Sequence, residues 1–230
     1  MPKVSAIVCA YNEAERIANI LSVLKNHPYI DEVIVVDDGS VDDTRAIVRK
    51  HDFVRLLTHD KNQGKSRAVM TGLEAARNDI VCFLDADLIG LVPEDVTQLL
   101  LPVLNGSADV TLSLRENSYR ICHAVGFDYI TGDRVFYKDL LEGYREEMKR
   151  ISGYGIEVYI NKRIIAKRMR VKSVLWKHVT NPSKLYKKKF KDGALQHIRM
   201  IVEILKVIPP WEVVRQHWEL SKLMERPYTN

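Results

Sequence analysis

The chain has 230 residues, a formal net charge of +5, and 46% hydrophobic and 28% charged residues. This length suits one domain, or one domain with an appendage, and the composition excludes collagen-like, low-complexity and wholly disordered chains. The three cysteines, Cys9, Cys82 and Cys122, lie far apart and form no CxxC pair. We therefore expect free thiols in a reducing compartment, and neither a disulfide framework nor a zinc site.

The positive charge is concentrated toward the C-terminus. Residues 161–200 contain thirteen Lys or Arg and one acid, Asp192. A basic block of this kind predicts an anionic partner: phosphate groups, anionic lipid heads or nucleic acid. The first apolar run is too short for a secretory signal, and no stretch of about 18 uncharged apolar residues occurs, so we expect a cytoplasmic protein without a membrane-spanning helix.

Strands and helices alternate through the first half of the chain. Apolar runs rich in β-branched residues predict strands at 4–11, 31–37, 54–59, 79–87 and 109–114. Helical spacing predicts helices at 13–25, from about 42 to 50, at 64–77 and at 93–104. The alternation predicts an α/β fold with a mostly parallel sheet covered by helices on both faces.

The pattern is looser after residue 115. It predicts a turn at 131–134, a glycine-rich loop entering a helix at 152–165, a strand at 170–179 and a basic loop. Two helices follow, at 194–208 and from Trp211 to about Met224, separated by Pro209 and Pro210.

Polar clusters follow three of the predicted strands: Tyr11-Asn12-Glu13, Asp37-Asp38-Gly39-Ser40 and Asp85-Ala86-Asp87. Ligands of parallel sheets bind at the carboxyl ends of strands, so we expect the three clusters to line one crevice. Asp85 and Asp87 point to the same side if their strand continues through both. Two adjacent carboxylates suit Mg²⁺ or Mn²⁺; the alternative is a solvated strand end or a helix cap.

The other polar positions also have two interpretations. Asp37 and Asp38 can accept hydrogen bonds from a base or from ribose hydroxyls, or can belong to a turn that precedes a helix cap. Gly64 and Lys65 can bind phosphate at a helix N-terminus, or form an ordinary helix start. Neither P-loop spacing nor a GxGxxG motif occurs, so dinucleotide redox chemistry has no support.

Four motifs carry a resemblance to a known family. The segments VCAYNEAERI, VVDDGSVDDT, NQGKSRAV and FLDAD occur in this order over roughly the first 90 residues. In sequence and spacing they resemble family 2 glycosyltransferases of the GT-A fold. A weaker similarity, in LSLRE, ITGDRVFYKDLL and GYGIEV, is to polyprenyl-phosphate sugar synthases such as dolichyl-phosphate mannose synthase.

The resemblance implies a metal-dependent inverting transfer of a sugar from a UDP- or GDP-sugar to a polyprenyl phosphate or another membrane lipid. It implies a GT-A catalytic domain over residues 1–180, and we expect a basic, helical extension over 181–230 packed on it. The nucleotide-sugar residues would be Ala10, Tyr11, Asn12, Glu13, Asp37, Asp38, Gly64, Lys65, Asp85 and Ala86, with Mg²⁺ or Mn²⁺ on Asp85 and Asp87. Ile89 stands where this branch often has Gln, which puts an extra metal or phosphate contact there in doubt.

The acceptor decides which further residues act. A phosphate acceptor arrives ionised and needs cations, and Arg115 and Arg134 stand where the polyprenyl-phosphate branch has arginines near that phosphate. A hydroxyl acceptor needs a base, for which Glu157 is the candidate. The alternatives are surface arginines and a helix N-terminal acid. The catalytic candidates are therefore Asp87, Glu157 and Arg134.

The C-terminal basic segment, with an amphipathic helix, Trp211 and Trp218, suits a peripheral contact with a membrane. The alternatives are a solvated face and a helix that packs on the sheet. Two other functions stay open: the same donor chemistry with a soluble glycan, metabolite or protein acceptor, and a nucleic-acid-binding module. The last lacks a recognised nucleic-acid fold and leaves the acidic crevice unexplained, so we expect no nucleic-acid partner.

Overall fold

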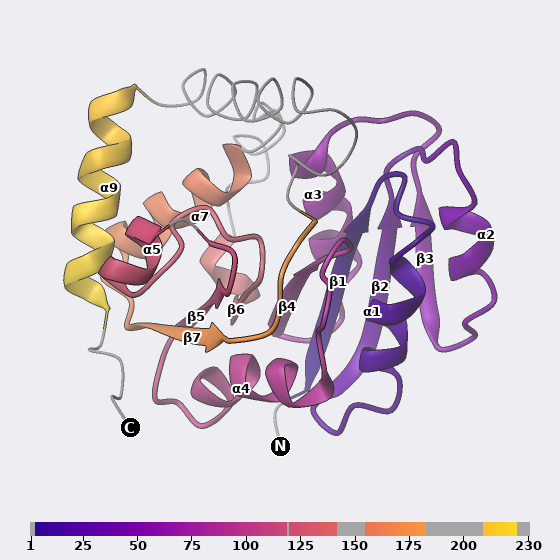
Figure 1. Cartoon of the computed structure of the whole chain (residues 1–230), viewed down its shortest axis with the longest axis horizontal. Coiled ribbons are helices and arrows are strands. Elements are labelled where there is room, and N and C mark those ends of the chain that lie inside the picture. The colour runs from indigo at the N-terminus through magenta and orange to yellow at the C-terminus, as the bar shows by residue number, and fades with distance from the viewer. Residues whose placement is uncertain (1–2, 119, 142–154, 183–208, 225–230) are drawn as a thin grey trace.

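The computed structural model describes residues 3–118, 120–141, 155–182 and 209–224. Its centre is a seven-stranded sheet in the order β3-β2-β1-β4-β6-β5-β7 (Figure 1). The strands are β1 (Val4–Ala10), β2 (Ile30–Asp37), β3 (Val54–Thr58), β4 (Ile80–Asp85), β5 (Val110–Arg115), β6 (Arg134–Tyr137) and β7 (Val171–Trp176). The helices are α1 (Ile17–Leu24), α2 (Thr44–Val48), α3 (Lys65–Ala75), α4 (Pro93–Leu104), α5 (Arg120–Val125), the 3₁₀ turn η1 (Lys138–Leu141), α7 (Gly155–Ala166) and α9 (Pro210–Leu223).

The sheet is mostly parallel, as the sequence predicts. Strands β1 to β4 pair in parallel, and so do β5 and β7, whereas β6 is antiparallel to both β4 and β5. Strand β6 and helix α5 are not predicted from the sequence. Strand β6 has only four residues and begins with Arg134, so it is too short to show an alternating pattern. Strand β4 ends at Asp85, two residues earlier than expected, and Asp87 lies in the turn that follows.

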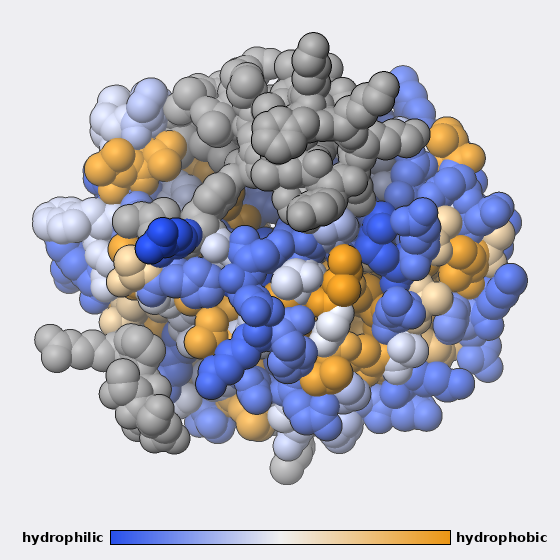
Figure 2. All heavy atoms as spheres, viewed as in Figure 1, coloured by the Kyte–Doolittle hydropathy of each residue, from blue (hydrophilic) through white to orange (hydrophobic). Residues whose placement is uncertain are grey.

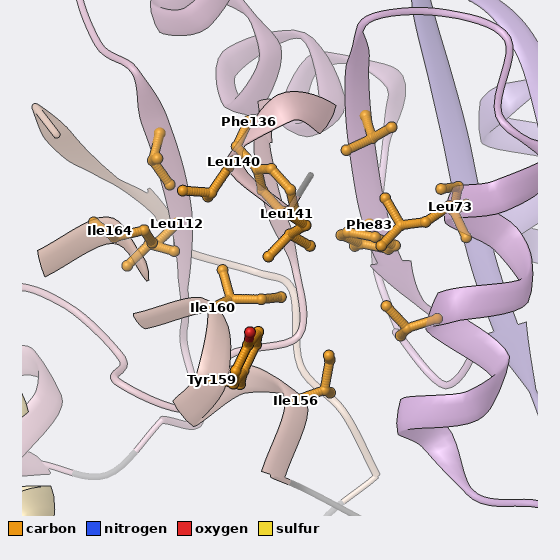
Figure 3. Close-up of a cluster of buried hydrophobic side chains, with 14 of the residues drawn as sticks. Leu73, Phe83, Leu112, Phe136, Leu140, Leu141, Ile156, Tyr159, Ile160 and Ile164 are labelled. Carbon is orange, nitrogen blue, oxygen red and sulfur yellow. The ribbon is translucent and has the colours of Figure 1, made fainter. Parts of the chain in front are cut away.

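Alternate residues of each central strand face two separate cores, because successive side chains of a strand point to opposite faces. Ile7 of β1 packs with α3 and α7, whereas Ala6 and Val8 pack with α1, α2 and α4. Figure 3 shows the first core, in which Leu73 of α3 and Ile160 of α7 lie on either side of Phe83 from β4. The sheet is therefore covered on both faces, as predicted.

Helix α9 packs against α7. Tyr129 donates a hydrogen bond to Gln216 Oε1 over 2.8 Å, Phe127 stacks on His217 with ring centroids 4.8 Å apart, and Leu220 is fully buried.

The predicted final helix is confirmed as α9. The basic loop beyond residue 182 and the predicted helix 194–208 lie outside the described residues. None of the helices in the described ranges has both the length and the hydropathy needed to cross a bilayer.

The contact between α3 and β1 depends on Gly72, where a methyl group would lie 2.4 Å from Ile7 Cγ2. We expect Gly72→Ala to lower the free energy of unfolding by about 1–2 kcal/mol, because so short a contact lies at the upper end of the roughly 1–3 kcal/mol cost of overpacking, and the better helix propensity of Ala offsets about 1 kcal/mol of that cost. Denaturant unfolding measures the change, with the exposed Glu74→Ala on the same helix as the control. A Gly72→Ala protein as stable as wild type would contradict this packing.

Candidate functional site

The ends of β1, β2 and β4 lie side by side, as the sequence analysis expects. The Asp38 N–H donates to Ala10 O over 2.8 Å, and Cys9 of β1 pairs in register with Asp85 of β4. Because β1 lies between β2 and β4, the three polar clusters meet at one edge of the sheet.

The clusters after β1 and β2 are joined by backbone-to-side-chain hydrogen bonds. Asn12 N–H donates to Ser40 Oγ over 3.0 Å, Val41 N–H donates to Asn12 Oδ1 over 2.9 Å, and Glu13 N–H donates to Thr44 Oγ1 over 2.8 Å. Asn12 has a positive φ of 56°, a conformation that Asn adopts more readily than most residues. Tyr11, which directly precedes these hydrogen-bonded residues, is 44% exposed, so its ring is accessible to a ligand.

The two carboxylates at the end of β2, Asp37 and Asp38, are both buried but have different partners. Asp37 Oδ2 accepts from Arg45 Nε at 3.0 Å and Nη2 at 2.8 Å. Asp38 accepts from the N–H groups of Gln63 at 2.9 Å and Gly64 at 2.8 Å, and its Oδ1 lies 2.6 Å from His59 Nδ1. Asp38 thus holds the loop that leads into α3, a role that the sequence pattern does not reveal. Its contact with a nucleotide stays a prediction.

Asp85 is held by two cations. Its Oδ1 accepts from Lys65 Nζ over 2.8 Å and its Oδ2 accepts from Arg115 Nη1 over 3.1 Å. Burial acts to raise the pKa of Asp85, but the charges of Lys65 and Arg115 outweigh burial and lower it below its ordinary value. Asp85 is therefore ionised, and it connects α3 to the end of β5.

Lys65 also contacts Glu157, whose Oε1 lies 2.8 Å from Lys65 Nζ. Burial acts to lower the pKa of Lys65, but Asp85 and Glu157 raise it well above its ordinary value. Glu157 lies in the first turn of α7 and is 2% exposed. Its place as a helix N-terminal acid is confirmed, and its pairing with Lys65 ties α7 to the end of β4.

Asp133 is a site residue that the sequence analysis missed. Its Oδ1 accepts from Asp85 N–H over 2.8 Å, and its Oδ2 accepts from Ser113 Oγ at 3.1 Å and Arg115 Nη1 at 3.3 Å. Burial and the charge of Asp85 raise the pKa of Asp133 to about 6. Asp133 precedes β6, so its position depends on an antiparallel strand that the pattern of apolar residues does not predict.

Both arginines assigned to the acceptor are buried: Arg115 is 8% and Arg134 1% exposed. The alternative that they are surface arginines is therefore wrong. Arg134 donates from Nε to Thr131 O at 3.2 Å and from Nη1 to Asn161 Oδ1 at 3.2 Å. Burial lowers the pKa of Arg134 from its ordinary value. A contact of either arginine with an acceptor phosphate stays a prediction.

A cavity of about 20 Å³ lies between these groups, and Lys65, Asp85, Arg134 and Glu157 supply its polar lining. The space suits about one water molecule. Within the described ranges, neither oxygen of Glu157 makes a hydrogen bond of good geometry. Together with Arg115 and Asp133, the lining groups make three cations and three carboxylates, a balance that allows four of them to be buried and Lys65 and Asp85 to be mostly buried.

Asp85 and Asp87 are the residues that fit a divalent cation. Mg²⁺ and Mn²⁺ bind through one or two carboxylates and complete their coordination with phosphate and water oxygens, so two carboxylates suffice. Lys65 and Arg115 contact both oxygens of Asp85, and Asp87 is half-buried in the turn that follows β4; a metal ion on these two residues stays a prediction. Among the described residues, no group of three or more His, Cys, Asp or Glu is arranged to hold a metal.

Residues 5–121 match the family model described as glycosyl transferase family 2. The chain belongs to this family. It is 32% identical over 128 residues to a UDP-N-acetylglucosamine–dolichyl-phosphate N-acetylglucosaminyltransferase of Methanococcus voltae, covering 47% of this chain and 50% of that protein. It is also 32% identical over 149 residues to a dolichol-phosphate mannosyltransferase of Pyrococcus furiosus, covering 60% and 38%.

This family member spans half or less of the length of those two relatives. Its fold is similar to that of glucosyl-3-phosphoglycerate synthase from Mycobacterium tuberculosis, crystallised with Mn²⁺, UDP and phosphoglyceric acid. The TM-score is 0.72 at 20% identity, and the match covers 90% of this chain and 78% of that one. Another crystal of that synthase contains Mg²⁺ and UDP. The GT-A fold is thereby confirmed.

Gly132 allows the close approach of Asp85 and Lys65, because a methyl group there would lie 2.4 Å from Asp85 Oδ1 and 2.6 Å from Lys65 Nζ. We expect Gly132→Ala to displace this pair and to weaken the binding of a nucleoside diphosphate with Mn²⁺ by at least about tenfold, as measured by calorimetry. Gly106→Ala is the control, since its φ of +71° strains the backbone while no atom lies within 4 Å of the added methyl. Equal affinity of both variants would contradict the prediction.

Proposed function

We propose that this protein is a metal-dependent, inverting glycosyltransferase that moves a sugar from a UDP- or GDP-sugar to a polyprenyl phosphate or another membrane lipid. The observation that carries the proposal is Asp85, ionised and fixed by Lys65 and Arg115, next to Asp87 at the carboxyl end of β4 in a member of glycosyl transferase family 2. The names of the archaeal relatives support a lipid-phosphate acceptor.

The donor half of the reaction uses the polar clusters at the ends of β1, β2 and β4. Breaking the bond between sugar and diphosphate leaves negative charge on the departing diphosphate, and a bound Mg²⁺ or Mn²⁺ would neutralise it as a Lewis acid. Asp87, with Asp85, would hold that ion. Tyr11, Asn12, Glu13, Asp37 and Asp38 surround the place of the nucleotide. Lys65 and Arg115 hold Asp85 ionised at the carboxyl end of β4 before the substrates bind.

The acceptor half needs either cations or a base. A phosphate monoester is already ionised near neutral pH and attacks without losing a proton. Glu157 is 2% exposed and its Oε1 is paired with Lys65 Nζ over 2.8 Å, so Glu157 is poorly placed to take a proton from an acceptor hydroxyl. The contact therefore favours a phosphate acceptor. That phosphate would replace groups to which Arg134 and Arg115 are now hydrogen-bonded. A hydroxyl acceptor on a soluble molecule is the alternative, with Glu157 as its base.

The donor chemistry is tested by incubating the protein with labelled UDP- and GDP-sugars, Mn²⁺ and a polyprenyl phosphate, and then extracting the product into organic solvent. We expect lipid-linked label with wild type and less than about a tenth of that rate with Asp87→Ala, a loss of more than about 1.4 kcal/mol of transition-state stabilisation. The exposed Asp60→Ala controls for removal of an acid. Full activity of Asp87→Ala would remove the metal role.

The acceptor is tested by two further variants. We expect Arg134→Gln to reduce transfer to a lipid phosphate by at least about tenfold. The affinity for the nucleotide should stay near normal, because the hydrogen bonds of Arg134 go to Thr131 and Asn161 and not to the proposed nucleotide-binding residues. Glu157→Gln should retain most of the activity. Circular dichroism checks the fold of each variant. An inactive Glu157→Gln together with an active Arg134→Gln would indicate a hydroxyl acceptor instead.

A further inference from the structure

The outer face of α9 carries large apolar side chains that the described part of the chain leaves uncovered. Trp211 is 66%, Val214 70% and Trp218 59% exposed. Their spacing of three and four residues places all of them on one side of the helix. Where α9 lies at the left edge of Figure 1, Figure 2 shows orange and near-white residues at the surface. Two tryptophans this exposed on one helix are unusual, because Trp is strongly buried on average.

The opposite face of α9 is fixed to the domain. Glu212, Gln216 and Leu220 are buried, Gln216 accepts from Tyr129, and His217 stacks on Phe127. The helix also begins at Pro210, which suits the first helical position. The tryptophans therefore project from a rigid support and cannot turn inward without breaking these contacts.

The charges around the stripe are positive or neutralised. Lys222 Nζ lies 3.0 Å above the ring of Trp218, and the exposed Lys162 of α7 is close enough to lower the pKa of Glu212. The two acids of α9 are paired within the helix, Glu212 with Arg215 at 2.6 Å and Glu219 with Lys222 at 3.4 Å. A half-exposed lysine above an indole suits a partner that places anions just outside an apolar layer.

We propose that the stripe formed by Trp211, Val214, Trp218 and Lys222 is the surface by which the protein docks on a bilayer that contains anionic phospholipids. Tryptophan rings reside at the boundary between headgroups and acyl chains, and a neighbouring lysine reaches the phosphates. The purpose of this contact rests on the proposed function, because it would hold the protein at the membrane that contains the acceptor. The docking itself requires neither donor nor acceptor.

Vesicles of phosphatidylglycerol and phosphatidylcholine, free of any polyprenyl lipid, provide the test. The protein has three tryptophans, and Trp176 is 1% exposed, so a blue shift of the emission on vesicle addition reports on Trp211 and Trp218. We expect co-sedimentation and a blue shift for wild type. The double variant Trp211→Ser with Trp218→Ser should bind at least about tenfold more weakly, since each ring buries a large apolar area.

Two comparisons make the test selective. Tyr137→Ser removes an exposed aromatic ring elsewhere, on β6, and should bind like wild type. Lys222→Glu should weaken binding to anionic vesicles by at least about fivefold, and added salt should reduce the difference. Unchanged binding by the double tryptophan variant, or no binding by wild type, would overturn the proposal. So would a wild-type dimer that the double variant converts to a monomer, which would assign the stripe to a second copy of the chain. Because these measurements involve no sugar transfer, they can contradict membrane docking while the proposed transferase activity holds. In the same way, the activity can be absent while docking holds.

Discussion

The arrangement of the site depends on the carboxylate of Asp85, whose side chain is only 20% exposed, and on the two cations that hold it. Asp85 ends the central strand β4, where desolvation alone would favour its neutral form. Lys65 from the start of α3 and Arg115 from the end of β5 keep it ionised, and Glu157 and Asp133 balance these cations in turn. Removing Lys65 would take away the cation paired with Glu157, which is 2% exposed, and removing one partner of a buried ion pair commonly costs about 3–5 kcal/mol. Elements far apart in the sequence are thus tied to one point.

This constraint also explains why small and apolar residues surround the charges. Gly132 leaves room for the contact between Lys65 and Asp85, and Gly39 lets the backbone after β2 approach residues 61–62, where a methyl group would lie 2.4 Å from Lys61 C. The thiol of Cys9 lines the same cavity, and burial raises its pKa to about 12, so it stays protonated and adds no further negative charge. The cluster remains near neutral until a ligand arrives.

The parts of the site that the sequence predicts are those that follow from local pattern. Tyr11, Asp38 and Asp85 directly follow or end apolar runs rich in β-branched residues. Parallel strands bring such ends together, so the convergence of these three residues can be predicted from the sequence. Gly132 and Asp133 are not readable in this way. Asp133 acts on Asp85 across 48 residues, through a four-residue strand that pairs in the antiparallel sense. The burial of Arg134 likewise depends on Asn161 in α7, which no spacing in the sequence connects to it.

The central claim is that a nucleoside diphosphate and a divalent cation bind together at the end of β4. A crystal structure of the protein soaked with UDP or GDP and Mn²⁺ tests it most directly, because the anomalous signal of manganese locates the ion without ambiguity. The account predicts an Mn²⁺ peak at the Asp87 carboxylate that is shared with diphosphate oxygens, with the nucleoside between the ends of β1 and β2. A nucleotide bound elsewhere on the molecule, or a manganese peak away from Asp85 and Asp87, would contradict it.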